Sequence, residues 1–208
     1  MAADFEKQSY WRDRFAAETS FEWLAPSATF MPFIEPHLLR RRGSSTGAPP
    51  RILHLGSGTS DLHAHFRMRG YRDLTNVDYE PLALERGREI EERAFGDVRM
   101  GYEVADVTRL CEDLDLGLGH ETRFDVVVDK STVDAVACGG EEQLRDMIAG
   151  VRACLAPDGI WISLSYSAGR FQLDGLPFDV EVIGKIPTPK TKVTDPDVYH
   201  WCYLLRPR

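Results

Sequence analysis

Short apolar runs alternate with helical patterns along the chain after residue 50. Strands are expected at residues 52–55, 74–77, 102–105, 124–128 and 160–164, and helices at 60–69, 81–95 and 141–155. The helix at 81–95 is marked at both ends, by Pro81 in its first turn and by Gly96 beyond its last residue. This alternation is typical of a parallel sheet with helices on its faces.

The two ends of the chain depart from this pattern. Helical patterns at 4–18 and 28–42 precede a linker rich in Gly, Ser and Pro over 43–50. Near the other end, strand-like runs at 180–184 and 199–205 have no helical pattern between them. Two strands joined without a crossover helix pair antiparallel.

Two further segments are expected to lack regular structure: 111–120 as a loop and 156–159, with its Pro-Asp-Gly, as a turn. The prediction for residues 1–208 is a single α/β domain with an N-terminal helical cap and linker over 1–50. The core over 51–208 is a seven-stranded, mostly parallel sheet with an antiparallel C-terminal strand pair.

Polar groups follow several of the expected strands. The first strand runs into the turn Gly56-Ser57-Gly58, and glycines there let main-chain N–H groups approach a ligand. Asp78, Asp106 and Asp129 each end a later strand. The carboxyl ends of parallel strands share one edge, so these groups are expected to form one site. The alternative for any single aspartate is that it only caps the next helix.

The pattern separates two classes of nucleotide. Asp61 stands where a dinucleotide fingerprint would have its third glycine. An acid after the second strand suits ribose hydroxyls, and one after the third suits an adenine amino group. S-adenosylmethionine carries both groups and no phosphate, so the sequence predicts a methyltransferase that releases S-adenosylhomocysteine. His63 and His65 do not share a helix face, and no metal is expected.

Composition and charge limit the classes of partner that are expected. The chain is 43% hydrophobic and 28% charged, as in soluble globular proteins, and no apolar run reaches the roughly 18 residues that a membrane span needs. A formal net charge of −8 argues against a nucleic-acid partner and suits a basic protein substrate. Four cysteines without C-x-x-C spacing indicate a reduced protein. A cytoplasmic monomer without a membrane partner is expected.

Several motifs resemble those of the small class I methyltransferases related to the lysine methyltransferases of translation elongation factor 1-alpha and of citrate synthase. The resemblance covers nearly the whole chain, and its most specific block is Asp129-Lys130-Ser131-Thr132-Val133-Asp134-Ala135. The other matching segments are 10–15, 21–24, 56–60, 76–79 and 199–203. The resemblance implies a Rossmann-like class I methyltransferase fold. The loop Gly-Ser-Gly-Thr-Ser departs from the family's Gly-Cys-Gly-Asn-Ser but keeps its glycines.

Roles in cofactor binding follow for the strand-end residues. Gly56 and Gly58 would let the loop approach the methionine tail and start the next helix. Asp78 would hold the ribose, Tyr79 would pack on the adenine, and Asp106 with the Val107 backbone would read the adenine edge. Lys130 would bind near the cofactor tail, or be an ordinary surface lysine. Asp129 is the candidate for orienting a substrate amine.

Aromatic residues near the start of the chain have two possible roles, packing and contact with the cofactor. By periodicity alone Trp11, Phe15 and Trp23 are packing residues. The resemblance implies that the N-terminal helix folds over the cofactor, with Trp11 and Phe15 lining the site and Trp23 nearby. An aromatic face near a cationic sulfonium is favourable in itself.

Three functions remain open from the sequence. The first is methylation of a lysine side chain on a protein, possibly a basic translation factor, as the resemblance implies. The second is N-, O- or S-methylation of a small molecule. The third is a cofactor-binding scaffold without catalysis, which the intact acids at three strand ends speak against.

Overall fold

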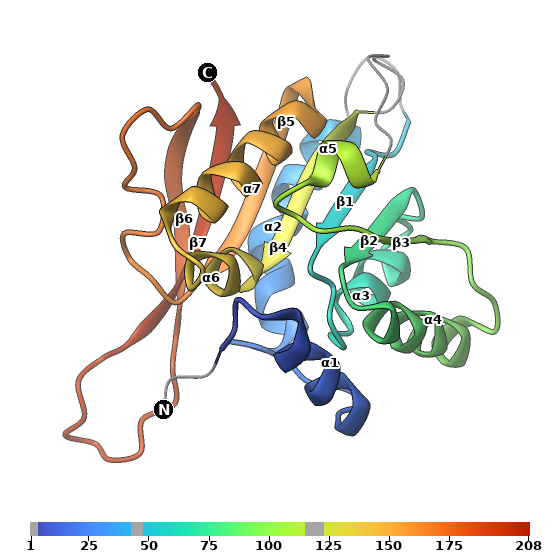
Figure 1. Cartoon of the computed structure of the whole chain (residues 1–208), viewed down its shortest axis with the longest axis horizontal. Helices are drawn as coiled ribbons and strands as arrows, with labels where there is room; N and C mark the ends of the chain where they lie inside the picture. Colours follow the sequence, from blue (N-terminus) through green and yellow to red (C-terminus); the bar gives the residue numbers. More distant parts are fainter. Residues whose placement is uncertain (1–3, 43–47, 115–122) are drawn as a thin grey trace.

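The computed structural model describes residues 4–42, 48–114 and 123–208 (Figure 1). Its helices are α1 (Gln8–Ala17), α2 (Ser27–Arg42), α3 (Leu62–Met68), α4 (Pro81–Phe95), α5 (Leu110–Asp113), α6 (Thr132–Ala137) and α7 (Glu141–Cys154). Its strands are β1 (Ile52–Leu55), β2 (Leu74–Asp78), β3 (Gly101–Val104), β4 (Phe124–Lys130), β5 (Leu155–Ser165), β6 (Phe178–Pro187) and β7 (Tyr199–Pro207).

All seven strands form one sheet in the order β3-β2-β1-β4-β5-β7-β6. Neighbours from β3 to β5 are parallel, and β7 is antiparallel to both β5 and β6. The predicted mostly parallel sheet with an antiparallel C-terminal pair is therefore confirmed. The direction of winding reverses between β1 and β4, and ligands of open α/β sheets bind at such a reversal, beyond the carboxyl ends of the strands.

Helices cover both faces of the sheet. Ile52 belongs to a cluster with the buried residues of α2, α3 and α4, whereas its neighbour Leu53 belongs to a second cluster with α5, α6 and α7. Successive side chains of a strand point to opposite faces, so every residue of β1 is buried. This explains why the central strands read as continuous apolar runs.

The N-terminal cap, residues 4–26, lies across the carboxyl-end edge of the sheet (Figure 1). It contacts the loops after two strands. The Gln8 side chain donates to the Tyr79 carbonyl after β2, and the Phe21 N–H donates to the Thr59 carbonyl after β1. Of the region 1–50 that was expected to form a helical cap and linker, residues 4–26 thus close one edge of the sheet, whereas α2 packs on a face of the sheet.

Several observed elements differ from the predicted ones. Helix α5 overlaps the start of the predicted loop 111–120, of which residues 115–120 lie outside the described residues. Helix α6 was not predicted, and β4 continues through Lys130. The predicted turn at 156–159 is a bulge inside β5, because Phe124 pairs with Leu155 and Val126 with Ile160. Residues 43–47 of the predicted linker also lie outside the described part of the chain.

Candidate active site

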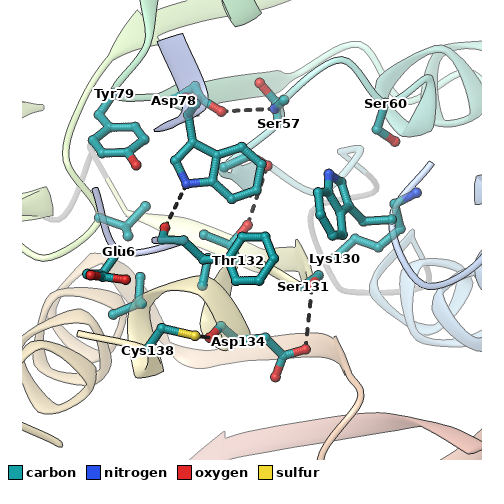
Figure 2. Close-up of a pocket in the computed structure, with 18 of the residues that line it drawn as sticks. Glu6, Ser57, Ser60, Asp78, Tyr79, Lys130, Ser131, Thr132, Asp134 and Cys138 are labelled. Carbon is teal, nitrogen blue, oxygen red and sulfur yellow. Dashed lines mark hydrogen bonds between the residues drawn. The ribbon is translucent and has the colours of Figure 1, made fainter. Parts of the chain in front are cut away.

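A cavity of about 430 Å³ lies beyond the carboxyl ends of β1 to β4, beneath the N-terminal cap. The cap contributes an aromatic wall, and the loops after the strands contribute polar groups (Figure 2). Residues of the cavity that were expected from the sequence are Trp11, Phe15, Trp23, Gly56, Gly58, Asp78, Tyr79, Asp106, Val107 and Lys130. Ten separate predictions thus meet in one place, and Asp129 is absent from the wall.

The Gly-x-Gly turn takes a backbone conformation that favours glycine. Gly56 has φ of 54° and Gly58 has φ of 51°, both in the left-handed region. The side chain that Gly56 lacks would collide with Thr132, whose Oγ1 donates to the Leu55 carbonyl at 2.9 Å. Packing on α6 therefore requires a glycine at position 56, and the expected approach of this loop to a methionine tail stays a prediction.

Asp78 fixes this turn through main-chain donors. Its Oδ2 accepts from the Gly58 N–H at 2.9 Å and its Oδ1 from the Glu80 N–H at 3.0 Å. Burial raises the pKa of Asp78 to about 6, and the two backbone donors oppose that rise. Each carboxylate oxygen can accept a second hydrogen bond, so Asp78 can still receive hydroxyl donors from a ligand.

Ser57 supplies a test of whether the cavity suits a polar ligand. Ser57 lines the cavity near Asp78 (Figure 2), and its hydroxyl is buried and has no hydrogen-bond partner in the part of the chain that the structure describes. A buried hydroxyl without a partner costs about 1–3 kcal/mol. A ligand that hydrogen-bonds Ser57 would recover that free energy, so the residues present fit a ligand with polar groups at this end.

The loop after β3 forms the opposite part of the wall. Asp106 Oδ1 accepts from the Thr108 N–H at 2.9 Å and from the Thr108 hydroxyl at 2.7 Å. Asp106 therefore shapes the turn before α5, whose N-cap residue is Arg109, and still lines the cavity beside the buried Val107. Tyr79 is half-buried on the same wall, and burial raises the pKa of its phenol.

The aromatic residues of the cap form a packed cluster. The Trp11 ring lies 5.6 Å from that of Phe15 and 5.5 Å from that of Trp23, measured between ring centroids. Trp11 Nε1 donates to the Phe5 carbonyl at 2.7 Å, which holds the indole in place. All three predicted aromatics reach the cavity wall, and their contact with a cofactor remains a prediction.

Lys130 does not have a free ammonium group. Its Nζ forms an ion pair with Glu22 and donates to the Ala25 carbonyl at 3.1 Å. Burial by itself raises the pKa of Glu22, but Lys130 outweighs this and brings the pKa to about 2. The surface-lysine alternative is excluded, and the ammonium points to the cap rather than to an open tail site.

Asp129 is placed differently from its prediction. The side chain is fully buried, Oδ1 accepts from the Val133 N–H at 3.1 Å, and Oδ2 accepts from Trp161 Nε1 at 2.8 Å. Burial raises the pKa of Asp129 to about 7. Its carboxylate holds the start of α6 against β5 and does not reach the cavity, so the expected contact with a substrate amine is corrected.

A second aspartate of the same motif lines the cavity instead. Asp134 accepts from the Ser165 hydroxyl at 2.5 Å, from Arg170 Nε at 2.9 Å and from the Tyr166 N–H at 3.0 Å. It thereby holds the loop after β5, and the half-exposed Tyr166 side chain lines the cavity. The sequence motif contained Asp134, but its partners lie more than 30 residues further along the chain.

Known proteins similar to this chain are methyltransferases. Methyltransferase srdJ of Neurospora crassa is 55% identical over 205 residues, which are 99% of this chain and 85% of that protein. EEF1A lysine methyltransferase 4 of Mus musculus is 28% identical over 182 residues, 81% of this chain and 64% of that protein. No protein-family model matches the chain.

A solved structure shares the fold. The N-methyltransferase NodS from Bradyrhizobium japonicum, in complex with S-adenosyl-L-homocysteine, aligns with a TM-score of 0.60 over 95% of this chain and 98% of that one. The two sequences are 15% identical, so this likeness concerns the fold alone. It agrees with the Rossmann-like sheet described above.

Proposed function

The chain belongs to the class I methyltransferase family, and on this premise we propose that it transfers a methyl group from S-adenosylmethionine to a lysine side chain of a protein. The lysine acceptor is supported by the relatives named EEF1A lysine methyltransferases, which are 28% identical to this chain. The relative at 55% identity is named only as a methyltransferase.

The charge of the cavity supports S-adenosylmethionine, rather than a dinucleotide, as the cofactor. Four carboxylates line it, those of Glu6, Asp78, Asp106 and Asp134. Among the described lining residues, Lys130 is the single Lys or Arg, and its ammonium is paired with Glu22. A dinucleotide would place its pyrophosphate here without a counter-charge, whereas a cation with hydroxyl and amino donors finds acceptors.

The residues of the wall suit the parts of this cofactor. Asp78 would accept hydrogen bonds from the ribose hydroxyls, Ser57 would offer its hydroxyl, and Tyr79 and Val107, which line the same cavity, would flank the adenine. When bound, S-adenosylmethionine supplies an electrophilic methyl group on a sulfonium cation. The rings of Trp11 and Phe15 exclude water from the cavity, and their faces favour a nearby positive charge.

The acceptor side is assigned to the loop after β5. Tyr166 is 55% exposed, lines the cavity, and is held at its main chain by Asp134. The chain only has to align the acceptor, whether an amine or another nucleophile, with the methyl group. The acceptor also loses one proton, which water can accept. Tyr166 is therefore the residue that we expect to contact the acceptor, in place of Asp129.

Labelled cofactor and a cell lysate test this proposal. The protein is incubated with S-adenosylmethionine carrying a labelled methyl group and with a lysate divided into protein and small-molecule fractions. We expect label on one protein, at lysine when the site is located by mass spectrometry. The Asp78→Ala variant serves as the control and should transfer little label, because it lacks the acceptor for the ribose.

A second candidate is methylation of a small molecule. It is favoured by one observation: the cap covers the cavity with aromatic side chains, and Asp129, the carboxylate expected to guide a lysine, is buried elsewhere. Label that appears only in the small-molecule fraction, while the Asp78→Ala control stays inactive, would establish this candidate and contradict the lysine acceptor.

A further inference from the structure

The Glu22–Lys130 ion pair joins two sequence motifs that lie 108 residues apart. Glu22 belongs to the segment 21–24 of the cap, and Lys130 is the last residue of β4. The Lys130 side chain is 3% exposed and the Glu22 side chain 25% exposed, so the pair is largely withdrawn from water. Cofactor binding as proposed above accounts for neither residue.

Glu22 is the centre of a wider set of contacts. Its Oε1 accepts from the Asp61 N–H at 2.9 Å, and its Oε2 accepts from the Ser27 hydroxyl at 2.7 Å. Lys130 adds its bond to the Ala25 carbonyl. One carboxylate thereby connects the end of the cap, the loop before α3 and the end of β4.

A strained residue lies inside this connection. Leu24 has φ of 63°, in the left-handed region that a leucine rarely adopts. Such a conformation persists when the contacts around it leave the chain no alternative. Lys130 holds Glu22 on one side of Leu24 and Ala25 on the other, and the Ala25 N–H donates to the Trp23 carbonyl at 2.7 Å, so the turn at Leu24 is fixed from both sides.

The aromatic residues of the cap are tied to the same segment. The Arg14 guanidinium lies 4.7 Å from the ring centroid of Phe21 and 4.6 Å from that of Trp23. Trp23 in turn packs on Trp11. A shift of segment 21–24 therefore moves the whole wall that covers the cavity.

We propose that the Glu22–Lys130 ion pair positions the cap over the cavity and thereby sets how long the cofactor stays bound. Both residues are positioning residues, because they act through the aromatic wall and not by contact with the reacting atoms. The effect on how long the cofactor stays bound rests on the proposed function. The statement that the ion pair holds the cap in place does not depend on the cofactor.

Three variants test the proposal: Glu22→Gln, Lys130→Met and the double variant. Each loses the ion pair, and Glu22→Gln keeps the length of the side chain and one acceptor oxygen. We expect hydrogen exchange of residues 5–25 in the free protein to rise at least tenfold, while exchange in β1 and β2 stays as in the wild type. S-adenosylhomocysteine should dissociate at least tenfold faster from each variant. The double variant should also show the faster exchange in the cap, because it too lacks the ion pair.

The control is Asp179→Asn, which breaks an exposed ion pair with Arg208 and should change neither measurement. Thermal unfolding of every variant shows whether the sheet is folded; if Lys130→Met does not fold, Glu22→Gln is used for the test.

Unchanged exchange in the cap of a folded Glu22→Gln variant would overturn the proposal. So would faster dissociation from Lys130→Met alone, since Lys130 would then contact the cofactor directly. Failure of the wild type to bind S-adenosylhomocysteine would instead contradict the proposed function, and the exchange measurement would still judge the pair.

Discussion

At the residue scale, Asp78 shows how the burial of a carboxylate lowers stability. The carboxylate is ordinarily ionised above pH 3.8, but burial raises its pKa in the folded chain to about 6. Protonated Asp78 is thus favoured by folding, and the free energy of unfolding falls as the pH rises from about 4 to about 6. At neutral pH the ionised group costs about 3 kcal/mol by this shift. The free energy is recovered when a ligand donates hydrogen bonds to it.

The same residue predicts how cofactor affinity depends on pH. Only ionised Asp78 offers acceptors for both ribose hydroxyls, so binding should weaken as the pH falls below about 6. We expect the Kd of S-adenosylhomocysteine to be about tenfold higher at pH 5 than at pH 7.5, measured by calorimetry. The Asp78→Asn variant should bind weakly with a flat profile. A wild-type affinity that does not change over this range would contradict the ribose assignment.

At the element scale, the sequence predicted those elements whose ends carry local signals. Helix α4 has the predicted bounds because Pro81 and Gly96 mark them, and the central strands were found because both sheet faces bury them. Helices α5 and α6 were missed because four and six residues complete no periodic pattern. Their helical state depends on tertiary contacts, such as the bond from the Val133 N–H to Asp129.

The residues of the candidate site also include features that the sequence predicts and features that it does not. Positions at strand ends could be predicted, because parallel strands bring their carboxyl ends to one edge whatever their length. The partners of individual side chains could not. Lys130 forms an ion pair with Glu22 of the cap, and Asp129 accepts a hydrogen bond from Trp161 of the neighbouring strand. Both pairings depend on how distant segments pack, which no local pattern records.

The cap as an element supports one prediction. Deletion of residues 1–19 removes α1 with Trp11 and Phe15 but keeps Glu22 and its ion pair. The sheet core should stay folded, and the Kd of S-adenosylhomocysteine should rise more than tenfold, because the aromatic wall is lost. Far-UV circular dichroism and thermal unfolding check the fold, and calorimetry measures the affinity. Binding within twofold of the wild type would assign these aromatics to packing alone.

At the scale of the whole molecule, charge separates the two candidate acceptors. The chain has a formal net charge of −8, and its field attracts a basic protein at low ionic strength. If a protein lysine is the acceptor, kcat/KM for the purified substrate should fall several-fold between 50 and 300 mM salt. A neutral small-molecule acceptor provides the comparison, because its kcat/KM should stay constant. A protein substrate whose kcat/KM is independent of salt would contradict electrostatic guidance.

The position of the cap in the chain has a consequence for synthesis. Five aromatic residues of the cap, Phe5, Trp11, Phe15, Phe21 and Trp23, are synthesised before the strands whose ends they cover, and the last of those strands ends at Lys130. After Trp23 is made, more than a hundred further residues must follow before these side chains have a complete sheet edge to pack on. They are then an exposed apolar segment on a nascent chain, the kind that chaperones bind. We expect the cap to reach its final position only after the sheet that follows it in the chain.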